Sequence, residues 1–124
     1  MTQDRITAFA VPVGRLAIAA LFLHEAWFKA THYAAAACYM HRFGVPGWLL
    51  PGALALELLG GLALASGFQA RWAALALAGF CVVAAAIFHT DFADGNQLLH
   101  FQKDIAIAGG LLILAAVPLR ATEV

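Results

Sequence analysis

The chain has 124 residues, of which 64% are hydrophobic and only 11% are charged, and its mean hydropathy is +0.86. Average soluble domains are about half apolar and about a quarter charged, so this composition excludes a disordered chain and argues against a soluble globule. Seven basic and seven acidic residues give a formal net charge of zero, so no basic surface for nucleic acid is expected. The class that remains is an integral membrane protein, with one domain over residues 1–124.

Four apolar segments are close to the roughly 17 to 25 residues that a membrane-spanning helix needs. They cover about residues 6–28, 48–66, 72–89 and 105–119. Pro12 and Pro51 fall in the first turns expected for the first two helices, where a missing N–H costs least, and Gly67 is suited to end the second. The fourth segment is short, and residues from Leu98 onward are expected to extend it into the membrane interface. None of the segments alternates as a barrel strand does, so the sequence predicts an all-α membrane four-helix bundle.

The charges of the connecting segments predict the orientation of this bundle. Four spans place both termini on one side of the membrane, and that side carries three arginines, Arg5, Arg71 and Arg120. The positive-inside rule therefore predicts that both termini lie in the cytoplasm of a bacterial inner membrane. On the opposite side, residues 31–47 mix aromatic residues with His and Arg, which predicts a short amphipathic helix at the outer interface.

Glu57 stands in the middle of the second predicted span, where an ionisable residue costs roughly 2.5 to 3.5 kcal/mol. It shares a face with Gly60-Gly61, and such a face packs closely against another helix, so we expect Glu57 to point into the bundle. Gly109-Gly110 is likewise interpreted as a packing pair. Arg15 is the expected partner of Glu57, because the two helices run antiparallel and the two depths differ by about one turn. A structural ion pair and a direct functional role both remain open for these two residues.

A second group of five ionisable residues lies near the outer ends of three predicted helices: Glu25, Lys29, His89, Lys103 and Asp104. We expect these residues to line one ligand-binding cleft open to the outer leaflet. His89 would exchange protons, and the two lysines would donate hydrogen bonds to a polar head group. The alternative is that each residue is a solvated helix-end group that reaches the interface by itself.

The sequence predicts no metal site and no built-in cofactor. No His and Cys residues have the short spacing of zinc ligands, and Cys38 and Cys81 are expected to be free thiols. A haem held by two histidines would need both at one depth, and His24 with His89 is the only fair pair. Phosphate loops, nucleophile elbows and dinucleotide motifs are also absent from the sequence. These residues do not decide whether the protein is an enzyme.

Several motifs follow one another in a fixed order along the chain. They are Arg15, Leu21-Phe22-Leu23, Lys29, Gly44-Val45-Pro46, Leu56-Glu57-Leu58-Leu59-Gly60-Gly61, Gly67, Arg71-Trp72-Ala73-Ala74, His89, Lys103-Asp104 and Gly109-Gly110. In this order they resemble the DoxX family of small bacterial membrane proteins, over about residues 12–115.

The resemblance implies a four-helix protein of the bacterial inner membrane. The family's name traces to a membrane subunit of quinone-linked oxidoreductases, including a thiosulfate:quinone type. The resemblance therefore implies a quinone-linked redox subunit that binds quinone or another polar ligand, sits in the lipid bilayer, and acts with a protein partner or as a homo-oligomer. The alternative is a non-catalytic membrane module that anchors a partner or handles a small solute or metal ion.

Overall fold

The structure, a computed structural model, describes residues 2–117, and every regular element in that range is helical. The elements are α1 (Gln3–Thr31), α2 (Tyr33–Arg42), the 3₁₀ turn η1 (Gly47–Leu49), α3 (Leu50–Ser66), α4 (Ala70–Phe88) and α5 (Gly95–Ala116). Four helices are long and apolar enough to cross a membrane: α1, η1 with α3, α4, and α5. The predicted all-α membrane four-helix bundle is thereby confirmed.

The four long helices, with η1 counted as the start of the second, begin earlier than hydropathy predicts, and capping side chains account for the early start of two of them. The side chain of Thr2 accepts a hydrogen bond from the Arg5 N–H at 3.3 Å and starts α1, while Asp94 accepts one from the Asn96 N–H at 2.9 Å and starts α5. A capping side chain of this kind satisfies an N–H that the helix itself leaves without a partner. Pro12 consequently lies inside α1 rather than in its first turn, where its ring removes one backbone hydrogen bond. At the other end of α5, the helix stops at Ala116, and residues 118–119 of the predicted span lie outside the described residues.

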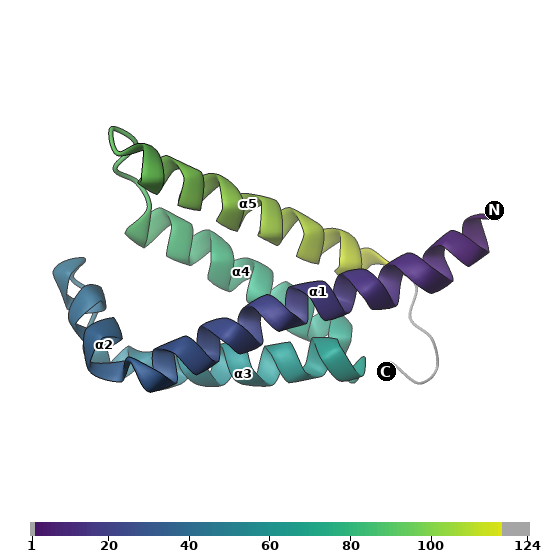
Figure 1. Ribbon diagram of the computed structural model, residues 1–124, viewed down its shortest axis with the longest axis horizontal. Helices are drawn as coiled ribbons and strands as arrows, with labels where there is room; N and C mark the ends of the chain where they lie inside the picture. The colour runs from purple at the N-terminus through teal and green to yellow at the C-terminus, as the bar shows by residue number, and fades with distance from the viewer. Residues whose placement is uncertain (1, 118–124) are drawn as a thin grey trace.

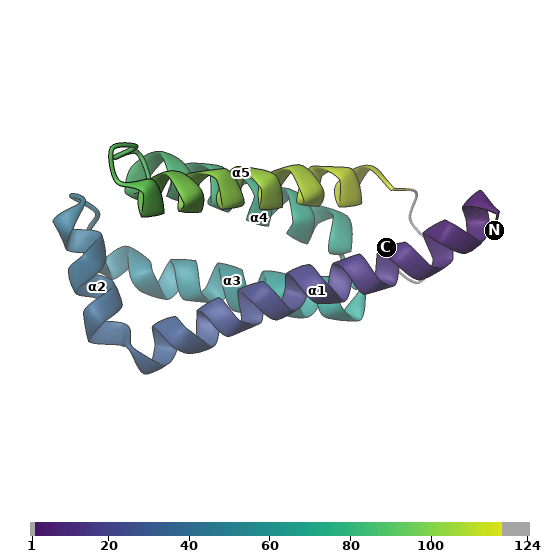
Figure 2. The ribbon, with the colours of Figure 1, turned by 45° about the horizontal axis from the view of Figure 1, so that its top comes forward.

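The helices form two pairs, with α1 packed along α3 and α4 packed along α5 (Figures 1 and 2). The pairs are joined mainly through α3 and α4, whereas α1 and α5 touch over a small area. Gly67 ends α3 as predicted: its φ of +83° suits glycine, and its N–H donates to the Ala63 carbonyl at 2.9 Å. We call the side of the α3–α4 turn the terminal end, and the side of α2 and the α4–α5 connection the loop end.

The predicted short helix after the first span is present as α2, at the loop end (Figure 2). Its Tyr39 ring and the following Phe43 ring lie 5.5 and 5.2 Å from the ring of Phe88, the last residue of α4. These aromatic contacts attach α2 to the second helix pair, because offset and edge-on ring pairs are favourable at such distances. The placement of α2 at a membrane interface stays a prediction.

Small side chains build the core of the bundle. It contains the following buried residues: Ala19, Phe22, Leu64, Ala70, Ala74, Leu77, Ala78, Cys81, Ala108, Leu111 and Ala115. A Cβ atom at Gly60 would lie 2.9 Å from Leu77 Cδ1, and one at Gly61 would lie 2.9 Å from Leu23 Cδ2, so both glycines are close-packing positions as predicted. Gly109 differs from this prediction, since a Cβ there would meet no atom within 4 Å; Gly110 makes only a loose approach to Ile18.

Candidate functional site

Glu57 points into the bundle as predicted, and its side chain is 2% exposed. The residue that meets it is Lys29 of α1, whose Nζ lies 2.8 Å from Glu57 Oε1. The same ammonium group donates a hydrogen bond of 3.3 Å to Glu25 Oε2, one helical turn earlier on α1. One cation therefore serves two carboxylates, one buried and one 44% exposed.

Lys29 thus takes the place that the sequence analysis gave to Arg15. The guanidinium of Arg15 lies instead beside Gly67, where a Cβ would approach its Nη1 to 3.0 Å. Gly67 is ten residues beyond Glu57, which corresponds to about 15 Å along α3 at 1.5 Å per residue. Arg15 lies far from Glu57 because of the register of α1 against α3. Gly61 packs closely against Leu23, and in this register the first turns of α1 lie beyond the end of α3 (Figure 1).

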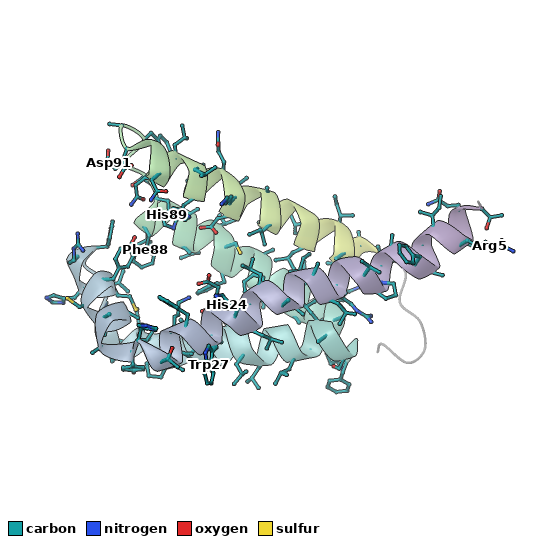
Figure 3. The ribbon with its side chains drawn as sticks, in the orientation of Figure 1. Arg5, His24, Trp27, Phe88, His89 and Asp91 are labelled. Atoms are coloured by element: carbon teal, nitrogen blue, oxygen red, sulfur yellow. The ribbon has the colours of Figure 1, made fainter. Side chains whose placement is uncertain are left out.

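His89 and Asp104 face each other across the second helix pair. Nε2 of His89 lies 3.7 Å from Asp104 Oδ2, and Nδ1 lies 2.9 Å from Gln97 Oε1. The His89 ring also stacks on the ring of His100, with centroids 5.1 Å apart. Three residues of α5 therefore hold one imidazole, and both ring nitrogens have a neighbour. Figure 3 shows His89 and Phe88 where α4 ends, at the loop end.

The Glu25–Lys29–Glu57 group lies on the first helix pair, and His89 and Asp104 lie on the second. Asp104 lies within electrostatic range of Glu25 and Lys29 of α1, in addition to His89 and His100. Exposed fractions of 24% for the Lys29 side chain, 19% for His89 and 25% for Asp104 leave each partly accessible from outside the protein. We call Glu25, Lys29, Glu57, His89 and Asp104 the loop-end cluster.

Four of the five predicted ligand-binding residues belong to this cluster, and Lys103 does not. Lys103 is exposed on α5, about 100° around the helix axis from Asp104, because successive residues turn by that angle. Its role as a donor to a ligand stays a prediction. The structure supplies Glu57 in its place, from α3.

Two further members of this region, Gln97 and His100, were not assigned a role from the sequence. They precede Asp104 by seven and four residues, so the three share one helix face. For His100 this spacing already indicates a shared face with Asp104 in the sequence. Gln97 was missed because it precedes Leu98, from which the fourth helix was expected to extend.

Cys38 and Cys81 are free thiols as expected, the first exposed and the second buried. Cys81 lies in α4 within electrostatic range of both Asp104 and Glu57.

The two histidines considered as a haem pair, His24 and His89, have different surroundings. His24 is exposed on α1, whereas the ring of His89 contacts Gln97, Asp104 and His100. Residues 2–117 contain no group of three or more His, Cys, Asp or Glu residues placed to hold a metal ion.

A shallow apolar groove of about 230 Å³ runs between α1 and α3 on the outer surface. Its lining is Leu23, Ala26, Trp27, Ala30, Leu54 and Leu58. Large apolar side chains are exposed on all four long helices, including Trp27 at 69% and Trp72 at 65%. Such a surface is suited to lipid, because no water is available there to penalise apolar exposure.

The fold and its lipid-facing surface define a multi-pass membrane protein with a charged cluster between two helix pairs. A family model described as DoxX matches residues 10–90. The inner membrane protein YqjF of Escherichia coli (strain K12) is 45% identical over 113 residues, which cover 91% of this chain and 87% of that protein. No solved structure matches the chain.

The chain belongs to the DoxX family, as its motifs indicated, and is a small multi-pass inner-membrane protein. The family match ends at residue 90. It therefore includes Glu25, Lys29, Glu57 and His89 of the loop-end cluster but not Asp104.

Proposed function

We propose that the protein is a ligand-binding subunit of a quinone-linked redox system, and that the loop-end cluster binds the head group of a quinone-type ligand. The observation that carries the proposal is the convergence of five ionisable side chains, from α1, α3, α5 and the residue that follows α4, at one end of an otherwise apolar bundle. Ionisable groups in membrane-spanning helices are costly, and they are by default candidates for a functional site.

The chemistry of a quinone fits these surroundings. Its ring is apolar and reaches a protein through the lipid, while its two oxygens need polar partners. The loop-end cluster supplies ammonium, imidazole and carboxylate groups. The rings of Tyr39, Phe43 and Phe88 border it at the end of α4. In this proposal His89 and Asp104 exchange protons with the ligand, and a partner protein supplies or removes the electrons.

The proposal is tested by binding a benzoquinone with a decyl chain to the purified protein in lipid nanodiscs. We expect saturable binding by the unaltered protein and loss of binding in His89→Ala. His41→Ala is the matched control, because it removes an exposed histidine from α2 at the same end. If the unaltered protein binds neither this quinone nor its reduced form, or if the two variants bind equally, the proposal is overturned in favour of a module that only anchors a partner.

We further propose that the loop end faces the periplasm and the termini face the cytoplasm. The support is the distribution of arginines described above. Single cysteines placed at Gln3 and at Asp94, in a chain without Cys38 and Cys81, report this orientation. A membrane-impermeant thiol reagent applied to intact spheroplasts should label the Asp94→Cys variant and spare Gln3→Cys. The reverse pattern would invert the topology.

A further inference from the structure

The loop-end cluster holds far more hydrogen-bond acceptors than donors. It contains three carboxylates, those of Glu25, Glu57 and Asp104, and Lys29 is the only lysine or arginine among its five members. A carboxylate offers about four acceptor positions, whereas an ammonium group offers three donors and no acceptor. Two of the directions around the Lys29 ammonium are already taken by Glu57 and Glu25, at 2.8 and 3.3 Å.

Glu57 shows this excess most clearly. Its side chain is 2% exposed, and its Oε1 faces the Lys29 ammonium at 2.8 Å as an ion pair. No further hydrogen bond to this oxygen is found within the described part of the chain. Because a carboxylate offers about four acceptor positions, Glu57 keeps acceptor positions that Lys29 does not fill. These positions are suited to accept a hydrogen bond from something outside the chain.

Asp104 adds a second under-used acceptor. The 3.7 Å between its Oδ2 and His89 Nε2 exceeds the usual range of a hydrogen bond, so this contact is an ion pair at most. The other His89 nitrogen is already paired with Gln97 at 2.9 Å. A ligand that brings its own O–H groups would find acceptors on both helix pairs, at Glu57 and at Asp104.

We propose that the site binds the reduced, hydroxyl-bearing form of its quinone-type ligand in preference to the oxidised form. The inference rests on the proposed function and names which redox form the site selects. An oxidised quinone has two carbonyl oxygens that only accept hydrogen bonds, so carboxylates repel it. A hydroquinone has two hydroxyl groups that donate.

The test compares anaerobic binding of a decyl-chain benzoquinone and of its chemically reduced hydroquinone to the full-length protein in nanodiscs. We expect the hydroquinone to bind at least tenfold more tightly. For a two-electron couple, a tenfold preference raises the midpoint potential of the bound ligand by about 30 mV relative to the free couple. Redox titration of the bound ligand therefore gives a second, independent readout.

Asp104→Asn and Glu25→Gln each replace a carboxylate by an amide of the same shape that also donates. Each should reduce the preference at least threefold, and Glu25→Gln keeps the test valid if Asp104→Asn does not fold, because Glu25 is 44% exposed. Asp91→Asn is the control, an exposed carboxylate in the α4–α5 connection that should change nothing. Equal or tighter binding of the oxidised form would overturn this inference and leave the proposed function standing. Failure of both forms to bind would overturn both.

Discussion

Towards the terminal end of the bundle, leucines and alanines from several helices are packed out of contact with solvent, with Leu64, Leu77 and Leu111 each at 0% exposure. The Arg71 side chain there donates a hydrogen bond of 3.1 Å to the Ala115 carbonyl and so satisfies the end of α5. At the loop end, by contrast, the two helix pairs present partly exposed charges.

The comparison of the two ends shows that the close packing and the charged side chains lie in different parts of one small bundle. Close packing of small residues is sufficient to hold helices together in lipid. Buried ion pairs contribute little net stability, because desolvation of the charges offsets their attraction. The charges at the loop end are therefore not needed to build the fold, which is why we assign them to a site.

The largest effect is expected from Lys29→Leu at the loop end. It leaves Glu57 buried and Glu25 nearby without their shared cation, and an uncompensated buried charge costs about 3 to 5 kcal/mol. Because Lys29 is 24% exposed, we expect a loss of about 3 kcal/mol. Unfolding in mixed micelles measures it. Lys103→Leu, an exposed lysine on α5, should change stability by less than about 0.5 kcal/mol. Similar losses in both variants would mean that Lys29 is not the partner of Glu57.

Gly60→Ala probes the packed region and should have an intermediate effect. The new methyl group would lie 2.9 Å from Leu77 Cδ1, and overpacking of this kind costs about 1 to 3 kcal/mol. Gly109→Ala is a matched control on α5, because its methyl group would meet no atom within 4 Å. The control should be neutral or stabilising by up to about 1 kcal/mol, since alanine favours helix over glycine. If Gly109→Ala were the more damaging of the two, the packing of α3 against α4 described above would be incorrect.

The smallest effect on stability is expected from His89→Ala. It removes the contact with Gln97 and the stacking on His100, and a net hydrogen bond contributes about 1 kcal/mol. The same variant should nevertheless lose ligand binding under the proposed function. A loss of stability above about 2 kcal/mol with binding retained would identify His89 as a structural residue instead.

The sequence predicted the class of fold, the four spans and the inward direction of Glu57, because these depend on local patterns: long apolar runs and a small-residue face around one carboxylate. It did not predict the partner of Glu57. The partner of Glu57 depends on the register of α1 against α3, and hydropathy contains no information on the register between two helices. Arg15 and Lys29 are fourteen residues apart on α1, or roughly 21 Å at 1.5 Å per residue, so the position of α1 along α3 decides which of them reaches Glu57.

The start of α5 was predicted only approximately, because the helix was expected to extend from Leu98 onward. Asp94 caps the helix at 2.9 Å from Asn96 N, so α5 begins at Gly95. Gln97 lies in the added residues. The contact between His89, which follows α4, and Asp104 of α5 required the structure, since spacing along a chain places residues on a face but does not align two helices.

The separation of stability from site chemistry is tested most directly by replacing the ion pair as a whole, with Lys29→Met and Glu57→Leu in one chain. These side chains have similar volumes and no charge, and such replacements of a buried pair are often neutral or stabilising by about 1 to 4 kcal/mol. We predict a folded protein at least as stable as the original, in which hydroquinone binding is weakened at least tenfold. A double variant as unstable as Lys29→Leu alone, or one that binds hydroquinone as well as the original chain, would contradict the account.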